Sequence, residues 1–145
     1  MTLRRDACDS KTFADLTLTV RDSGPATVVE LSGEFDAYTA YELRRYLALY
    51  PSHRFVHVVM DLRRLGFIDS AGIAVIVALS KQATGRAGTL RLVIPESHLL
   101  VKLRRMGLIK LWPIHADVES AVAAAERAQR ESQRPGPAFS RSIVQ

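Results

Sequence analysis

Two runs of alternating apolar and polar residues lie near the start of the chain. Leu16, Leu18 and Val20 are separated by threonines, which is the period-two pattern of a strand with one buried face. A turn-forming segment over residues 22–25 follows, and the alternation resumes over residues 29–35. Two such runs joined by a short turn predict an antiparallel hairpin.

The next segment changes from the strand period to the helix period. Thr39 and Glu42 have the spacing of a capping box, in which the threonine oxygen accepts an amide three residues on and the glutamate reaches back. Apolar residues then recur at steps of three and four as far as Tyr50, where Pro51 prevents continuation. We therefore predict a helix that begins at Thr39.

A buried strand and an apolar helix are predicted in the middle of the chain. Residues 55–60 are almost continuously apolar, which is typical of a strand covered on both faces. Residues 61–73 read as the end of this strand, a short loop and the first turn of a helix. Residues 73–79 carry no charge, and a small domain would struggle to cover every face of such a helix. We expect a partner to cover part of it.

The remaining pattern alternates between strands and helices. We predict a strand over residues 90–94, a helix capped by Ser97 and ended by Gly107, a strand over residues 108–112, and a final helix capped by Asp117. A hairpin followed by alternating helices and strands indicates an α/β domain. Its sheet is mixed, with about five strands and about four helices.

Composition places the chain among soluble single domains. Of its 145 residues, 48% are hydrophobic and 24% are charged, which is enough apolar material for one core. Residues 1–15 are polar without periodicity and residues 129–145 have little to bury, so we expect a domain over residues 16–128 between two flexible ends. The longest apolar run is too short to span a membrane. A single cysteine, Cys8, cannot form an internal disulfide, which favours the cytoplasm.

The net charge of +5 raises the question of nucleic-acid binding. Residues 127–145 hold four arginines against one glutamate, so this tail contributes +3 (4 − 1 = 3) and the rest of the chain only +2. We interpret the excess as solvated surface, and we expect no direct binding of nucleic acid.

The sequence lacks the residue spacings of the common enzyme motifs. A nucleophile elbow needs glycine two residues before its serine, and Ile68 stands there before Ser70. No G-x-G-x-x-G and no phosphate-binding loop is present. The histidines fall on separate predicted elements, and His57, in a run of valines, is expected to be a hydrogen-bonded strand residue. We therefore expect no catalytic residue, no metal and no cofactor.

Ser70 has two interpretations. As the first residue of a helix it can be a cap, whose oxygen satisfies one backbone amide and contributes about 1 kcal/mol. It also lies at a strand-to-helix corner, where a phosphate would face the positive end of the helix dipole. A phosphoserine would add a charge of about −1.5 to −2 next to Asp69. Such a charge would weaken anything docked over the corner without unfolding the domain.

The stretch from Asp61 to Ile73 resembles, without a gap, the signature of the STAS domain as found in bacterial anti-sigma factor antagonists. Residues 32–43 and the segment 106–108 are similar to two further parts of that family, so the resemblance covers about residues 16–128. Tyr41 stands where many relatives have proline. The resemblance implies a small mixed sheet with its helices packed largely on one face.

The resemblance also implies a function in partner switching. In that family the unphosphorylated antagonist binds a serine kinase that doubles as an anti-sigma factor, and this binding releases the sigma factor. The kinase then phosphorylates the antagonist with ATP, and a serine phosphatase reverses the mark. Carried over to this sequence, the phosphoacceptor is Ser70, and Asp36, Asp69, Gly72 and Ile73 join it on the partner-binding surface. The chain itself is then a binding module and not an enzyme.

Two other functions stay open at the level of sequence. Similar domains regulate membrane transport systems, in which case Ser70 is structural and the partner is a permease or an ATPase. Nucleotide binding is a weaker hypothesis, because the phosphate-binding motifs are missing. The sequence does not decide between a monomer and a homodimer, and it does not name the sigma factor.

Overall fold

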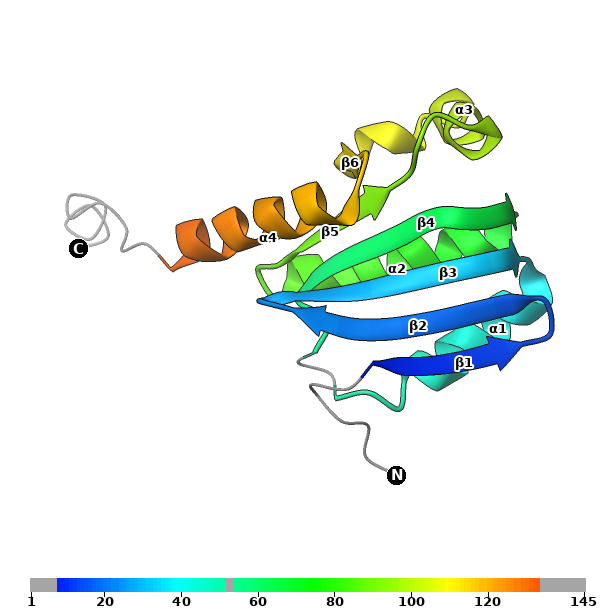
Figure 1. Cartoon of the computed structure of the whole chain (residues 1–145), viewed down its shortest axis with the longest axis horizontal. Coiled ribbons are helices and arrows are strands. Elements are labelled where there is room, and N and C mark those ends of the chain that lie inside the picture. The colour runs from blue at the N-terminus through cyan, green and yellow to red at the C-terminus, as the bar shows by residue number, and fades with distance from the viewer. Residues whose placement is uncertain (1–7, 52–53, 134–145) are drawn as a thin grey trace, which may run out of the picture.

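The computed structural model describes residues 8–51 and 54–133, and its strands form one mixed sheet (Figure 1). The strand order follows the chain: β1 (Asp9–Phe13), β2 (Leu16–Ser23), β3 (Ala26–Phe35), β4 (His57–Ile68), β5 (Thr89–Val93) and β6 (Ile114–His115). The first three strands pair antiparallel, and the pairs from β3 to β6 are parallel. The predicted hairpin, the mixed sheet and the interior position of β4 are confirmed.

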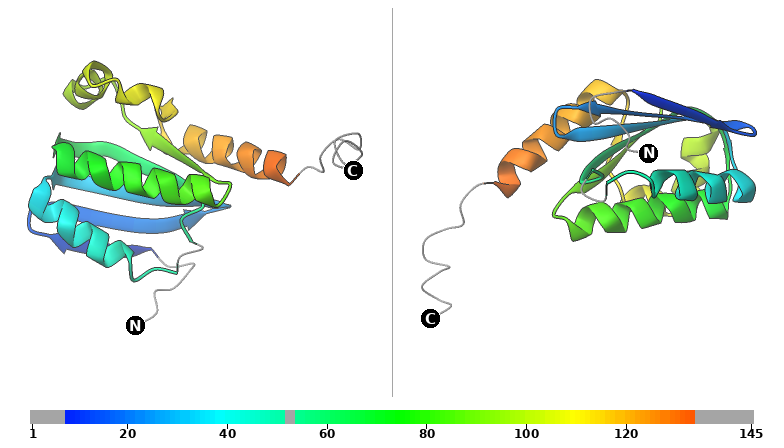
Figure 2. Two further views of the ribbon diagram at one scale, coloured as in Figure 1. Left: turned by 180° about the vertical axis from the view of Figure 1, so that it is seen from behind. Right: turned by 90° about the horizontal axis from the view of Figure 1, so that it is seen from below.

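Helices cover both faces of this sheet. They are α1 (Ala37–Leu47), α2 (Ser70–Gly85), α3 (His98–Arg105) and α4 (Val118–Ser132). Viewed from behind, α1 and α2 lie side by side across one face, whereas α4 packs on the other (Figure 2). The alternation of β3 explains the two layers, since Val29 belongs to the core under α1 and α2 and its neighbour Val28 to the core under α4.

The two cores differ in size. The larger one joins the sheet to α1, α2 and α3 through big side chains such as Leu31, Leu43 and Ile76. The smaller one holds α4 with mostly small residues, among them Ala121 and Ala125. Small side chains let the helix approach the sheet closely but bury little area. Much less apolar contact therefore holds α4 than holds α1 and α2.

The apolar helix α2 is covered mainly by its own domain. Its large side chains Ile73, Val75, Ile76 and Leu79 are each at most 8% exposed, because α2 packs against β4 and β5 and lies beside α1. Ala74, which is small, is one of its outward positions. The domain itself therefore buries most of the apolar side chains of this helix, and the expected contact of a partner with part of α2 stays a prediction for its exposed positions.

Helix α1 begins earlier than predicted. Its N-cap is Asp36, whose side chain accepts the amide of Thr39 at 3.0 Å, while the Thr39 hydroxyl accepts the amide of Asp36 at 2.9 Å. Thr39 is thus the third helical residue of a capping box and not the cap. The pairs Asp36–Thr39 and Thr39–Glu42 both have the capping-box spacing. The first pair forms the cap because β3 ends at Phe35 and the helix starts directly after the strand.

Three other boundaries differ from the prediction. Residues 9–13, expected to belong to a flexible extension, form the edge strand β1, and α4 continues to Ser132, beyond the predicted boundary at 128. The segment predicted as a strand over residues 108–112 contains a 3-10 turn, η1 (Leu108–Lys110), and the strand β6 follows it. Gly107 ends the α3 region with φ of 73°, the left-handed conformation expected of a helix-ending glycine. Residues 1–7 and 134–145 lie outside the described residues.

Strand β4 is longer than its neighbour β3 and bulges against it. Strand β4 has twelve residues and β3 has ten, and the register between them shifts twice, between Glu30 and Ser32 and between Gly33 and Glu34. The predicted loop between this strand and α2 is therefore strand as far as Ile68. The bulges bring the two strands to the same level at their ends, where Phe35 pairs with Ile68.

None of the helices within residues 8–51 and 54–133 has the length and apolar character needed to cross a membrane.

Candidate functional site: the strand-to-helix corner at Ser70

Two aspartates stand side by side at one end of the sheet. Asp36 follows β3 and Asp69 follows β4, and each is the N-cap of the helix that comes next. The Asp69 amide donates to the Phe35 carbonyl at 3.2 Å, which extends the parallel pairing by one bond. Sequence reasoning placed both residues in the candidate site, and the structure brings them together.

Asp69, and not Ser70, caps helix α2. Its Oδ1 accepts the amides of Ala71 at 2.9 Å and Gly72 at 3.1 Å, and its carbonyl accepts the amide of Ile73 at 3.0 Å. Ser70 is the first helical residue. The interpretation of Ser70 as the cap is therefore wrong, since the carboxylate one residue earlier already fills that place.

Ser70 is exposed, and its hydroxyl forms no hydrogen bond with any residue that the structure describes. A serine with no structural contact can be modified without breaking anything that holds the fold. The side chain is thus available to an enzyme that approaches this end of the molecule.

Gly72 and Ile73 lie beneath the corner. Gly72 is buried, and a Cβ at this position would come within 2.7 Å of the Phe35 carbonyl oxygen and 2.8 Å of Ile68 Cγ1. Ile73 is 8% exposed. Both residues hold the first turn of α2 close to the strand ends, and they expose little side-chain surface in the isolated chain. Their place on the partner-binding surface stays a prediction.

The Asp36 carboxylate is held in its charged form. The backbone amide of Thr39 donates to it, and this hydrogen bond lowers the pKa of Asp36 below its ordinary value of 3.8. With Asp69 beside it, the corner presents two acidic side chains around Ser70. A phosphate on Ser70 would add to this negative charge.

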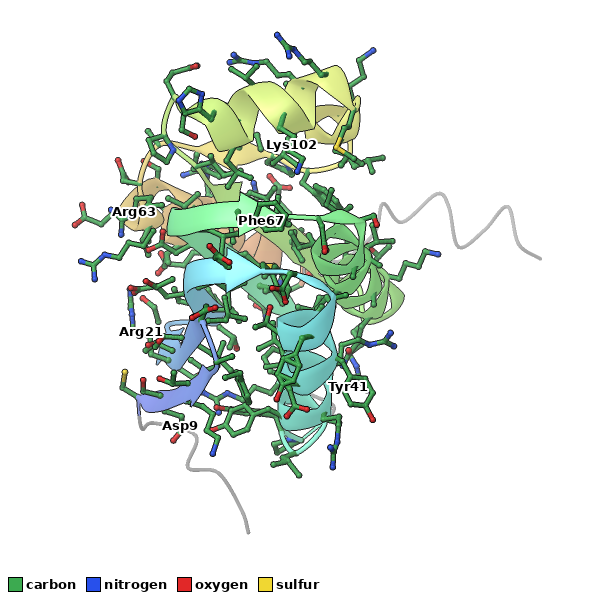
Figure 3. The ribbon with its side chains drawn as sticks, turned by 90° about the vertical axis from the view of Figure 1, so that its right-hand side faces the viewer. Asp9, Arg21, Tyr41, Arg63, Phe67 and Lys102 are labelled. Carbon is green, nitrogen blue, oxygen red and sulfur yellow. The ribbon has the colours of Figure 1, made fainter. Side chains whose placement is uncertain are left out.

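Helix α3 adds a cation and an aromatic contact that sequence reasoning missed. The Lys102 ammonium donates to the Ile68 carbonyl oxygen and lies 5.2 Å from the centre of the Phe67 ring. Figure 3 looks onto this end of the molecule, with Lys102 above Phe67 and Tyr41 of α1 below it. Phe67 is 43% exposed because the bulged strand no longer alternates. No sequence pattern signals that arrangement.

Further exposed apolar side chains come from the helices that border the corner. Tyr38 and Tyr41 of α1 are about 60% exposed, and Val101 and Met106, within and just after α3, are also exposed. A mixture of aromatic, apolar and charged groups around a free hydroxyl is typical of a surface that binds another protein.

The family model named STAS domain matches residues 17–121. This chain belongs to the STAS domain family. The chain is also 30% identical over 102 residues to the anti-sigma F factor antagonist of Paenibacillus polymyxa, a match that covers 68% of this chain and 86% of that protein.

Solved structures show the same fold. An anti-sigma factor antagonist from Mycobacterium paratuberculosis superposes with a TM-score of 0.66 at 24% identity, over 80% of this chain and 99% of that one. SpoIIAA in its unphosphorylated form matches with a TM-score of 0.59 at 18% identity, over 83% of this chain and 96% of its own. At these identities the likeness establishes the fold of the STAS domain and nothing further.

The buried histidine of this STAS domain has a structural role. His57 is 2% exposed, and its ring nitrogens contact Gln129 Oε1 at 2.7 Å and Thr89 Oγ1 at 3.1 Å. The prediction that it is a hydrogen-bonded strand residue is confirmed. Its bond to Gln129 ties β4 to α4.

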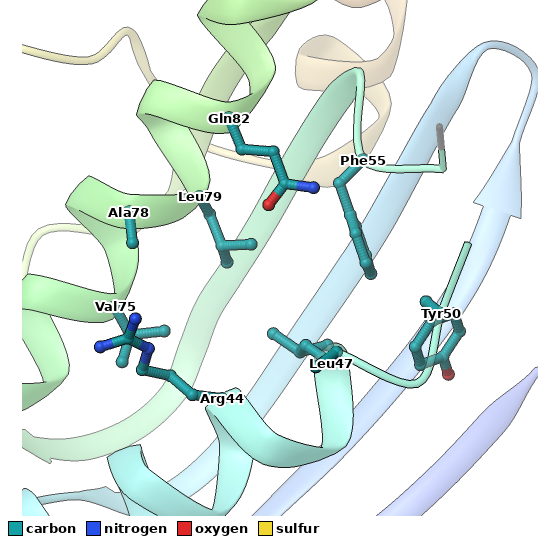
Figure 4. Close-up of a pocket in the computed structure, with 9 residues that line it drawn as sticks. Arg44, Leu47, Tyr50, Phe55, Val75, Ala78, Leu79 and Gln82 are labelled. Carbon is teal, nitrogen blue, oxygen red and sulfur yellow. The ribbon is translucent and has the colours of Figure 1, made fainter. Parts of the chain in front are cut away.

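A separate cavity of about 260 Å³ opens between α1 and α2, away from the start of α2 (Figure 4). Its lining is mainly apolar, including Leu47, Phe55 and Leu79, with Arg44 and Gln82 as polar groups. Among the residues of the STAS domain that the structure describes, no three His, Cys, Asp or Glu side chains gather where they could hold a metal ion.

Proposed function

We propose that this chain is an anti-sigma factor antagonist switched by phosphorylation of Ser70. In its unphosphorylated form it binds an anti-sigma factor that is a serine kinase, and the sigma factor is released. The kinase transfers the γ-phosphoryl group of ATP to Ser70 Oγ, ADP leaves, and the hydroxyl proton passes to a base on the kinase. A serine phosphatase restores the hydroxyl, and the cytoplasm is the compartment in which these partners meet.

The exposed, unbonded hydroxyl of Ser70 is the observation that carries this proposal. Asp69 has taken over the capping of α2, so Ser70 can be modified and restored without cost to the helix. Membership of the STAS domain family and the name of the relative from Paenibacillus polymyxa support the choice of partner.

The switch works by electrostatics at a docking surface. A phosphate of about −2 charge would join Asp36 and Asp69 on one corner. Burying that much charge under an apolar or acidic partner costs several kcal/mol, and every 1.4 kcal/mol weakens binding tenfold. The helix and sheet underneath keep their contacts, because the Ser70 hydroxyl forms no hydrogen bond with any described residue.

The test uses the purified chain with its cognate kinase and ATP. Intact-mass and peptide mass spectrometry should find one phosphate on Ser70, and Ser70→Ala should abolish it, while Ser80→Ala on the same helix should not. Phosphate found only on another residue contradicts the site. Recovery of a permease or transport ATPase in place of a soluble kinase contradicts the choice of partner.

A second test measures the affinity of the chain for the kinase. Ser70→Asp should weaken the complex by at least tenfold. Thr84→Asp places the same charge at the far end of α2 and should leave the affinity within about twofold. Equal binding by the Ser70→Asp variant and the unmodified chain would count against the electrostatic switch.

A further inference from the structure

The amides at the start of α2 are already occupied, which bears on where a phosphate on Ser70 would find a partner. A helix N-terminus ordinarily binds phosphate through its free backbone N–H groups. Here the amides of Ala71 and Gly72 donate to the Asp69 carboxylate, and the amide of Ile73 donates to the Asp69 carbonyl. The three amides that follow Ser70 are therefore engaged. Of the first amides of α2, this leaves only the N–H of Ser70 itself without an acceptor among the described residues, so a phosphate gains from a further donor.

Lys102 is a cation that reaches the same edge. Its ammonium donates to the Ile68 carbonyl oxygen and lies over the ring of Phe67, and it forms no ion pair with any described residue. An ammonium has three N–H donors, so further donors are free. Arg104, on the same helix, is by contrast paired with Glu96 at 2.8 Å.

The separation between Lys102 and a phosphate on Ser70 is bounded by the chain itself. Ile68 precedes Ser70 by two residues, so their Cα atoms are at most about 7 Å apart. Once the ammonium-to-carbonyl bond and the length of the phosphoserine side chain are added, a phosphate on Ser70 Oγ lies at most about 15 Å from the ammonium that is bonded to the Ile68 carbonyl. Rotation of the long lysine side chain can shorten this distance to a direct contact.

We propose that Lys102 is the positioning residue for the phosphate on Ser70, and that it exchanges its bond to the Ile68 carbonyl for a charge-assisted bond to the phosphate. This inference rests on the proposed function, in which Ser70 is the phosphoacceptor. The hydrogen bonds at this corner place three charged groups near Ser70, namely Asp36 and Asp69 at the strand ends and Lys102 of α3. The two carboxylates repel the phosphate, and Lys102 alone of the three attracts it.

The exchange alters the surface as well as its charge. In the unphosphorylated chain the ammonium of Lys102 covers part of the exposed Phe67 ring. When Lys102 turns to the phosphate, the Phe67 ring loses this cation and the corner presents a different side-chain arrangement. A partner that recognises the Lys102–Phe67 pair would then lose a contact in addition to meeting the new negative charge.

The decisive experiment is a phosphorus NMR titration of the full chain with phosphoserine installed at position 70 during translation, without any kinase. Loss of Lys102 should raise the second pKa of the phosphate, so Lys102→Met should titrate about half a pH unit higher than the unsubstituted chain, a threefold change in the dissociation constant. Lys110→Met removes the same charge from the following 3-10 turn and should change that pKa much less.

Two further measurements separate a phosphate contact from a structural effect. Lys102→Arg should restore the lower pKa, and the difference between Lys102→Met and the unsubstituted chain should nearly vanish at about 1 M salt, where the Debye length is about 3 Å. On phosphorylation, the ring protons of Phe67 should shift in the unsubstituted chain and stay nearly unchanged in Lys102→Met.

An equal phosphate pKa in the unsubstituted chain and in Lys102→Met overturns the inference. Because the phosphoserine is installed without a kinase, that outcome is independent of whether a kinase modifies Ser70 in the cell. Conversely, a chain that no kinase phosphorylates can still show the Lys102 effect, so the two proposals fail separately.

Discussion

The amide of Asp69 donates a hydrogen bond to the carbonyl of Phe35 at 3.2 Å, and this one bond joins the ends of two parallel strands just where two helices begin. It places the cap of α2 next to the cap of α1, Asp36. Ser70 follows the first of these caps and therefore projects from a rigid corner. The geometry of the candidate site thus depends on strand pairing and capping, and Ser70 itself contributes to neither.

The capping role of Asp69 can be tested by stability. Asp69→Ala should lower the free energy of unfolding by about 1 kcal/mol, because two amides of α2 lose their acceptor. Ser70→Ala should change it by less than about 0.5 kcal/mol. Urea unfolding followed by circular dichroism measures both, and an equal loss in the two variants would show that Ser70 shares the capping.

Gly72 should not tolerate a side chain. Gly72→Ala places a Cβ within 2.7 Å of the Phe35 carbonyl oxygen, so we expect a loss of about 1 to 3 kcal/mol from displaced backbone. Gly85→Ala, at the other end of the same helix, has open space around its Cβ and should be neutral or stabilising by up to about 1 kcal/mol. The melting temperature of Gly72→Ala should fall, whereas that of Gly85→Ala should stay unchanged or rise.

Asp36 should contribute to acid sensitivity. Its folded pKa lies below the ordinary value of 3.8, chiefly because the Thr39 amide donates to the carboxylate. The unfolded chain therefore binds a proton more readily, so the stabilisation is present above pH 3.8 and is lost as the pH falls through the folded pKa. Asp36→Asn, which cannot titrate, should show a flatter dependence of unfolding free energy on pH below about 4. Identical pH profiles for the two chains would contradict this.

The bond between His57 and Gln129 should hold α4 in place. Gln129→Ala leaves a buried ring nitrogen without its partner and should cost about 1 to 3 kcal/mol. Arg130→Ala, an exposed neighbour on α4, is the matched control and should cost less than about 0.5 kcal/mol. Hydrogen exchange should become faster in α4 of the Gln129→Ala variant before it does so in α2, since the core under α4 is the smaller one. Uniform exchange throughout the chain would show that α4 does not open separately.

Local sequence signals were sufficient to predict helix caps, a helix-ending glycine and the hairpin. Ser97 and Asp117 cap the helices predicted for them, accepting the amides of Leu100 and Ser120, and Gly107 takes the left-handed conformation. The alternation that begins at Leu16 and resumes in β3 predicted the hairpin. These features depend on neighbours in the chain, so the pattern of residues carries them.

Where the sequence offered two possible N-cap residues, the position at which the preceding strand ends decided between them. Thr39 and Ser70 both have the composition of a cap, but an aspartate precedes each, and the pairing of Phe35 with Ile68 selects the aspartate in both cases. The bulges in β4 likewise break the alternation that would have predicted which side Phe67 faces. A single sequence cannot count bulges, because they are defined by the partner strand.

By itself the sequence determined the α/β class, the order of most elements, the family resemblance and the position of Ser70 at the start of a helix, since propensity, periodicity and capping act over a few residues. Only the tertiary structure decided that the helix α2 is buried by its own domain, that Asp69 frees the Ser70 hydroxyl, and that Lys102 reaches the Ile68 carbonyl from a helix 34 residues further along the chain. The physical reason is that burial and charge contacts depend on which elements meet in space, and those meetings are set by packing of the whole domain.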